Sequence, residues 1–190
     1  AGPPPPMPDI AQELVERLRA GDPTAKVYVE FERQVSRTRL RTSEGADIDQ
    51  PGSQLSIDIS VERVRGDDVL LVGDQVNEIA LADSYLEATE HLAHKIRLVD
   101  KPAKLRSGRM PVLFAPSAGL LLLLPIMLGV NGKNVQRGTS PLADKVGESV
   151  FDPQLTIWDD PLLPRRPASS SHDDEGVPCY RKALIEQGRC

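Results

Sequence analysis

The chain has 190 residues, 39% of them hydrophobic and 27% charged, a composition typical of a folded protein that can bury a core. Its net charge of −5 argues against broad binding to nucleic acid or to anionic membranes, since both require clustered lysine and arginine. Two cysteines, Cys179 and Cys190, are too few for a disulfide framework. We therefore expect reduced thiols in a cytoplasmic protein. The longest apolar run, 118–130, is too short to span a membrane.

The beginning of the chain predicts a tail followed by a helix. Residues 1–8 contain four consecutive prolines and are interpreted as an extended tail. Asp9 can cap the helix that follows, with Gln12 three residues later as in a capping box. Apolar residues then recur at helical spacing until Gly21, which we expect to end the helix.

Strands are predicted next. The alternation of apolar and polar residues is clearest over 55–61 and predicts a half-buried strand. Three more strands are expected at 27–31, 35–40 and, as a short edge strand, 69–72. Glycine and polar residues predict turns at 43–47 and 66–68. A second helix is predicted over 83–98, which makes residues 9–105 a small domain with an antiparallel sheet and two helices.

The chain changes character after a basic link at 101–108, which is interpreted as a solvated loop. Apolar residues dominate 118–130, which is expected to be a helix. Strands are predicted at 110–114 and 154–158, and 181–187 is expected to be a final strand or helical turn. Residues 106–190 are therefore a second domain, and we expect that domain to be incomplete in this chain.

Several motifs follow one another in this second part. They are Pro-Val-Leu-Phe-Ala-Pro at 111–116, Arg-Gly-Thr-Ser at 137–140, Lys-Val-Gly-Glu at 145–148, Leu-Thr-Ile-Trp-Asp-Asp-Pro at 155–161, Asp-Asp-Glu-Gly-Val-Pro at 173–178 and Leu-Ile-Glu-Gln-Gly at 184–188. In this order and spacing they resemble the TldD/PmbA family, long labelled modulators of DNA gyrase and related to metallopeptidases. The turn at 42–45 resembles, more loosely, the middle domain of that family.

The resemblance implies an α+β protein, a small antiparallel-sheet domain with two helices followed by the N-terminal part of the β-rich, peptidase-like TldD/PmbA C-terminal domain. It also implies a cytoplasmic peptidase system for peptide maturation or proteolysis. Family members form dimers, some from two unequal subunits. Their catalytic subunits carry His-Glu-x-x-x-His on a helix, where both histidines bind zinc and the glutamate activates water.

This sequence departs from the family at that motif. Counting back from Gly138, the histidine positions hold Leu123 and Leu128, and the glutamate position holds Leu124. Leucine has no lone pair for a metal and no proton to exchange. No histidine or glutamate lies between Met110 and Gly147, so a different register does not restore the motif. We therefore expect a PmbA-like chain with no cofactor of its own, and zinc only in a partner subunit.

Other polar residues of the chain are candidate metal ligands. His91 and His94 lie three apart on the predicted second helix, but no cysteine and no third histidine is near in sequence, and a surface or partly buried helix is the favoured interpretation. His172, Asp173 and Glu175 could bind a hard cation, although carboxylates that accept backbone N–H groups in a turn are favoured.

Acidic residues are also the candidate contacts to substrate. Asp159 and Asp160 follow a predicted strand, and Asp174 and Glu175 lie in the acidic motif. Each pair could contact a peptide, or could simply end a strand or close a turn. For Asp159 and Asp160 the structural interpretation is favoured. Cys179 has no neighbouring histidine to lower its pKa, so an inert thiol is favoured.

The expected function is that of a non-zinc subunit in a TldD/PmbA-type peptidase system, forming a homodimer or a heterodimer with a TldD-like subunit and helping to shape a channel for a peptide substrate. The leucines of 120–124 could form a dimer face, although a buried helix is favoured. One alternative is a regulatory binding protein of the gyrase-modulator type. Another is a hydrolase using a different site near 172–175, so whether this chain is itself an enzyme stays open.

Overall fold

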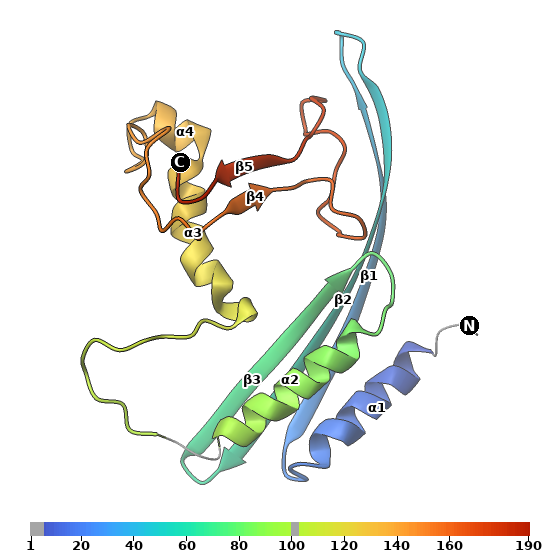
Figure 1. The fold of residues 1–190 in the computed structure, drawn as a ribbon. Helices are drawn as coiled ribbons and strands as arrows, with labels where there is room; N and C mark the ends of the chain where they lie inside the picture. Colours follow the sequence, from blue (N-terminus) through green and yellow to red (C-terminus); the bar gives the residue numbers. More distant parts are fainter. Residues whose placement is uncertain (1–5, 100–102) are drawn as a thin grey trace. The chain divides into compact units, whose positions relative to one another are not determined.

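The computed structural model describes residues 6–99 and 103–190, which divide into two compact units (Figure 1). Unit 1 comprises Ala1–Lys104 together with Leu163–Pro178, and unit 2 comprises Leu105–Leu162 together with Cys179–Cys190. Helices and antiparallel strands occur in both, so the fold is α+β, as expected. Unit 1 is therefore discontinuous in sequence. Its last sixteen residues, Leu163–Pro178, follow most of unit 2 along the chain and are called the returning segment below.

Unit 1 is a three-stranded antiparallel sheet with two helices on one face (Figure 1). The strands follow one another in the order β1-β2-β3, with bounds β1 Lys26–Arg41, β2 Asp47–Arg65 and β3 Asp68–Glu78. The helices are α1 Met7–Arg19 and α2 Ser84–Val99. Alternate residues of β2, among them Ile57 and Ile59, are buried against these helices, as the period-2 pattern predicts.

The first helix begins earlier than predicted. It starts at Met7 with Pro6 as N-cap and no side-chain cap, so the prediction of Asp9 as cap is wrong. Proline is tolerated in the first turn of a helix because the N–H groups there have no intrahelical partner. Pro8 therefore joins the helix, Asp9 falls within its first turn, and Gln12 donates to Glu16 instead of closing a capping box.

The strands are longer than predicted. Residues 27–31 and 35–40 belong to one continuous strand, and β3 extends well beyond 69–72. The turns predicted at 43–47 and 66–68 do join the strands. Beyond the part that the helices cover, β1 and β2 continue as a two-stranded ribbon, in which residues 36–41 pair with residues 47–52. One face of this ribbon is exposed, whereas Leu40, Ile48 and Gln50 on the other face are half-buried. The strand predicted at 35–40 is the β1 side of this ribbon, whereas its β2 side, residues 47–54, was not predicted. Backbone pairing needs no apolar face, so the polar residues there give no hydropathy signal.

Unit 2 holds short elements: the 3-10 helix η1 Pro116–Ala118, α3 Gly119–Val130, α4 Gly132–Gln136, β4 Ile157–Asp159 and β5 Lys182–Ile185. Strands β4 and β5 pair antiparallel, with Ile157 opposite Ile185. The apolar run is helical, as expected. The strand predicted at 110–114 is absent from the described structure, because no described strand pairs with it and Leu113 is 97% exposed. In the described parts of the chain, no helix has the length and apolar character needed to cross a membrane.

Candidate functional site

Helix α3 carries the three positions at which the resemblance places the catalytic motif. Leu123, Leu124 and Leu128 all lie on this helix. Their side chains present only methyl groups, so the residues present do not fit zinc. Within residues 6–99 and 103–190, no group of three or more histidine, cysteine or acidic side chains is arranged to hold a metal ion.

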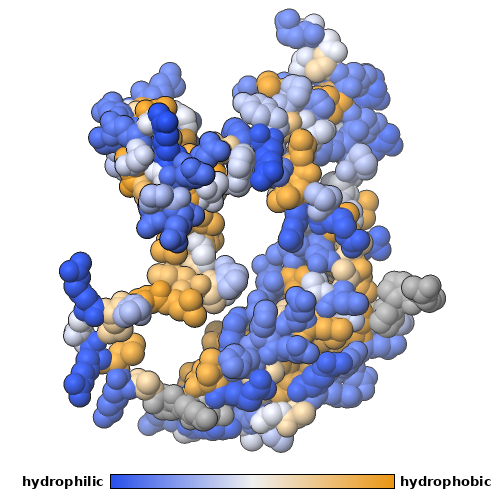
Figure 2. Space-filling model, in the orientation of Figure 1, coloured by the Kyte–Doolittle hydropathy of each residue, from blue (hydrophilic) through white to orange (hydrophobic). Residues whose placement is uncertain are grey.

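The leucines of α3 are exposed. Between 39% and 70% of the surface of each residue from Leu120 to Leu124 is accessible. Figure 2 shows the corresponding hydrophobic band along α3. The expectation of a buried helix is therefore wrong for the described chain, in which each of these leucines keeps more than a third of its surface accessible. An apolar surface of this kind is characteristic of an interaction site.

The carboxyl end of α3 is fixed by the segment that follows. Ser140 Oγ donates to the carbonyl oxygen of Gly129 at 2.5 Å, and Asn134 Nδ2 donates to that of Leu128 at 2.9 Å. A Cβ on Gly129 would lie 2.9 Å from Leu142 Cδ1, so glycine allows Leu142 to pack closely. The Arg-Gly-Thr-Ser motif thus anchors the end of α3, a role that the sequence alone did not reveal.

Asp159 and Asp160 are engaged in ion pairs at the end of β4. Lys182 Nζ lies 2.6 Å from Asp159 Oδ2, and Arg181 Nε lies 3.3 Å from Asp160 Oδ2. The hydrogen bond to Asp159 is the main cause that raises the pKa of Lys182. The Arg181 guanidinium also lies over the Trp158 ring, 4.2 Å from its centroid. These contacts join β4 to β5, while contact with a substrate stays a prediction.

Asp173 shapes a tight turn. Its Oδ1 accepts hydrogen bonds from the N–H groups of Glu175 at 3.0 Å and Val177 at 2.8 Å. Gly176 has φ +87°, a conformation that favours glycine. This is the structural role expected for the acidic motif. His172 shares a hydrogen bond between its Nδ1 and Ser171 Oγ at 3.0 Å, and it does not join Asp173 and Glu175 in a metal-binding group.

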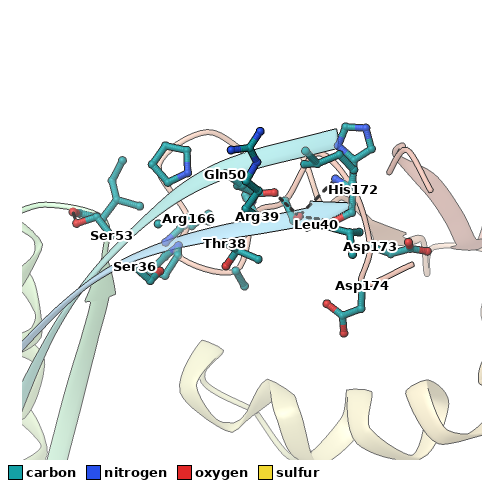
Figure 3. A pocket seen from close by; sticks show the side chains of 18 residues that line it. Ser36, Thr38, Arg39, Leu40, Gln50, Ser53, Arg166, His172, Asp173 and Asp174 are labelled. Atoms are coloured by element: carbon teal, nitrogen blue, oxygen red, sulfur yellow. Dashed lines mark hydrogen bonds between the residues drawn. The ribbon is translucent and has the colours of Figure 1, made fainter. Parts of the chain in front are cut away.

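A pocket of about 400 Å³ lies within unit 1 (Figure 3). One wall is the ribbon of β1 and β2 beyond the helices, where Ser36 lies opposite Gly52 and Thr38 lies opposite Gln50. The other wall is the returning segment, with lining residues between Arg166 and Asp174. Ser170 Oγ donates to Gln50 Oε1 at 3.1 Å and so links the two walls. This combination of residues was not predicted.

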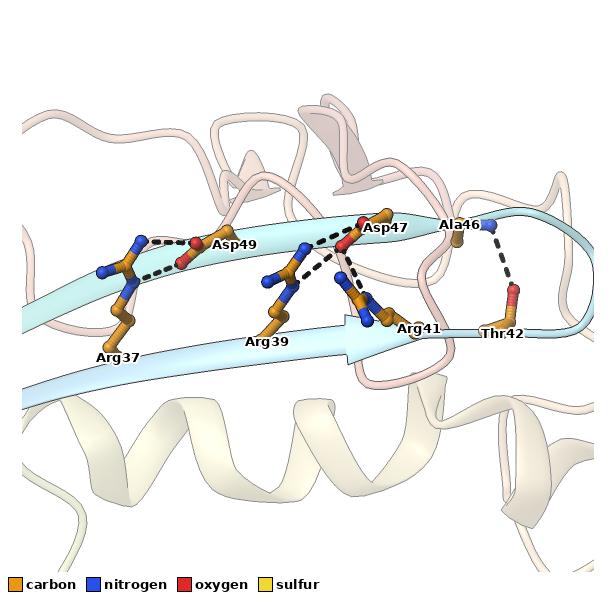
Figure 4. Close-up of polar contacts among 7 residues, drawn as sticks. All are labelled: Arg37, Arg39, Arg41, Thr42, Ala46, Asp47 and Asp49. Atoms are coloured by element: carbon orange, nitrogen blue, oxygen red, sulfur yellow. Dashed lines mark hydrogen bonds and ion pairs between the residues drawn. The ribbon is translucent and has the colours of Figure 1, made fainter.

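Ion pairs hold the ribbon in register (Figure 4). The Arg37 guanidinium contacts Asp49 through two hydrogen bonds of 2.7 Å and 2.6 Å. Arg39 contacts Asp47 in the same way, with two distances of 3.0 Å, and Arg41 adds a third contact to Asp47. Hydrogen bonds from Arg39, and then from Arg41, lower the pKa of Asp47. By strand alternation, these paired side chains lie on the face of the ribbon opposite to the one that carries Ser36, Thr38 and Gln50.

Comparisons with known proteins agree with the resemblance. Residues 107–190 match the family described as the PmbA/TldA metallopeptidase C-terminal domain. A relative from Haemophilus influenzae, named Metalloprotease TldD homolog, is 34% identical over 103 residues, which are 54% of this chain and 20% of that protein.

Two solved structures are similar to the chain. TldE from Thermococcus kodakarensis has a TM-score of 0.75 and 26% identity, covering 100% of this chain and 46% of that one. A Thermotoga maritima protein described as a candidate modulator of a DNA gyrase has a TM-score of 0.82 and 25% identity, covering 95% of this chain and 42% of that one. The chain thus spans less than half the length of each of these three proteins.

Proposed function

Because this chain belongs to the TldD/PmbA family, we propose that it acts as a non-zinc subunit of a cytoplasmic TldD/PmbA-type peptidase system, in peptide processing or proteolysis. The observation that carries this proposal is the set of leucines at the motif positions Leu123, Leu124 and Leu128 of α3. Without ligands on that helix, the zinc and the activated water would come from another subunit.

The exposed leucines of α3 support pairing with that subunit. Large apolar surfaces are rare on monomeric proteins and mark contact sites. The partner would be a second copy of this chain or, for catalysis, a TldD-like subunit that carries the complete zinc motif. In this arrangement the present chain forms part of the wall of a peptide channel and contributes binding rather than bond cleavage.

The test is to mix the chain with a zinc-loaded TldD-like subunit from the same organism and to measure association by light scattering and cleavage of an unfolded peptide. Leu121→Lys places a charge on α3, and Leu71→Lys, at a similarly exposed leucine of β3, is the matched control. We expect Leu121→Lys to weaken association at least about ten-fold and Leu71→Lys to leave it unchanged. Stoichiometric zinc in this chain alone, with peptide cleavage, would refute the proposal.

A regulatory binding protein is the second candidate, because the Thermotoga maritima structure that resembles this chain is described as a candidate gyrase modulator. The negative net charge makes DNA itself a poor ligand for such a protein. Direct binding to purified gyrase, at a fixed stoichiometry and without peptide cleavage in the mixture above, would favour this candidate over the subunit role.

A further inference from the structure

We propose that the pocket of unit 1 binds a short peptide with free ends, its carboxylate at Arg166 and its amino group at Asp174. This inference rests on the proposed function, because it specifies the class of peptide that the proposed subunit would bind. Both residues line the pocket. In Figure 3, Arg166 lies toward Ser36, and Asp174 lies toward the opposite end, beside Asp173.

The charges of the pocket decide the class of ligand. Arg39 is paired with Asp47, and Asp173 Oδ1 accepts from the N–H groups of its own turn, which fixes this carboxylate beside Asp174. Within the described chain, neither Arg166 nor Asp174 has an ion pair or a side-chain hydrogen bond. The pocket therefore offers a ligand the Arg166 cation at one end and the carboxylates of Asp173 and Asp174 at the other. A simple anion or a simple cation would use only one of these ends, whereas a zwitterion with separated charges uses both.

The walls favour a peptide over other zwitterions. The exposed hydroxyl groups of Ser36 and Thr38 can donate to and accept from peptide groups. A Cβ on Gly52 would lie 2.5 Å from Ser36 Oγ, so glycine at this position leaves room for that hydroxyl group. Leu40 and Ile48 add an apolar part that suits an aliphatic side chain. A volume of about 400 Å³ lies within the range of small-ligand sites.

The ligand test uses the complete 190-residue chain and the tripeptide Ala-Leu-Ala in titration calorimetry. We expect saturable binding of the free tripeptide. Amidation of its carboxyl end, or acetylation of its amino end, should each weaken binding about ten-fold, the scale of one charge-assisted hydrogen bond at an accessible site. Equal affinity for the free and the doubly blocked peptide would overturn the proposal, as would no binding at millimolar concentrations.

The residue test uses adjacent pairs as matched controls. Arg166→Gln should weaken binding of the free tripeptide about ten-fold and abolish the effect of amidation, while Arg165→Gln, which removes the same charge outside the lining, should change neither. Asp174→Asn should likewise abolish the effect of acetylation, with Glu175→Gln as its control. If the variant and its control lose the same amount of affinity for the tripeptide, binding depends on the net charge of the protein and not on Arg166 or Asp174, which would overturn the assignment. Displacement of the peptide by inorganic phosphate, irrespective of Asp174, would identify an anion site and overturn it too.

These experiments separate this inference from the proposed function. Peptide binding is measured on the chain without zinc or a partner subunit, whereas the subunit role is measured by association and cleavage. A chain that binds the tripeptide but never associates with a TldD-like subunit would refute only the subunit role. A chain that associates and supports cleavage, but binds free and blocked tripeptides with equal affinity, would refute only the assignment of the pocket.

Discussion

At the scale of single residues, Asp22 is a buried carboxylate between α1 and β1, with only 5% of its surface exposed. The Thr24 hydroxyl donates to Asp22 Oδ1 at 2.6 Å, and Arg65 Nη2 donates to Oδ2 at 2.7 Å. Arg63 lies further away, 3.7 Å from the same oxygen. The Thr24 hydroxyl is the main cause that lowers the pKa of Asp22, helped by the Thr24 N–H and both guanidinium groups and opposed by burial.

This lowered pKa predicts a pH dependence of stability. Ionised Asp22 stabilises the folded chain above the unfolded pKa of about 3.9, and this contribution disappears as the pH falls through the lower folded pKa. Asp22→Asn should therefore lower the urea midpoint at neutral pH, and its deficit relative to wild type should shrink at about pH 2. Circular dichroism would follow the unfolding. Asp67→Asn, at an exposed turn, is the control, and a deficit independent of pH would contradict the prediction.

The sequence could identify acidic residues as candidate contacts to substrate, but it could not identify the residues that surround them in the fold. The acidic motif marked both Asp174 and Glu175 as substrate contacts, yet only Asp174 lines the pocket. Which of two neighbours in one turn faces the ribbon depends on packing across the fold. Gln50 and Ser170, which join the walls of the pocket, are 120 positions apart. No local pattern relates such distant residues, and hydroxyl groups carry no hydropathy signal.

At the scale of elements, helix α2 stabilises unit 1 through one apolar face. Leu92, on the buried face of this helix, is 0% exposed, whereas Leu98 near its carboxyl end is 58% exposed. Leu92→Ala should lower the free energy of unfolding by about 3 kcal/mol, because it leaves a cavity in the core. Leu98→Ala should change it by less than about 0.5 kcal/mol. Urea titration of both variants makes the comparison, and equal losses would show that α2 is not packed in this way.

The elements that the sequence predicted best are those with a periodic apolar face. The helix expected over 83–98 matches α2, and the alternation over 55–61 lies in the buried part of β2. Apolar content alone misled the prediction at 110–114, since a strand needs a partner as well as apolar residues. The same limit applies to 118–130, which is helical as expected but exposed in the described chain.

At the scale of the whole molecule, the returning segment Leu163–Pro178 completes unit 1. Gly176 lies close to the ribbon, where a Cβ would be 3.3 Å from Leu40 Cδ2 and 3.5 Å from Ile48 Cδ1. If a specific protease site is placed between Lys104 and Leu105 and cut, we expect both fragments to elute together in size-exclusion chromatography. The segment of the second fragment remains packed on the ribbon of the first.

A variant of Gly176 provides the control for this experiment. Gly176→Val adds a branched side chain at φ +87°, where it meets the ribbon and strains the turn. The cut fragments of this variant should separate more readily than those of the wild-type chain. Separation of the wild-type fragments in native buffer would show that the returning segment does not hold unit 1 together.

The same discontinuity has a consequence for synthesis on the ribosome. The helices and the sheet of unit 1 leave the exit tunnel first, but Leu163–Pro178 follows only after most of unit 2 has been made. At about 5–20 residues per second, this delay amounts to several seconds. During that interval the Ser36 face of the ribbon is uncovered, and the register of its strands is set by their backbone pairing together with the arginine–aspartate pairs. Opposite charges on facing strands favour the native register over a shifted one, so we expect these pairs to disfavour mispairing of the hairpin until its covering segment has been made.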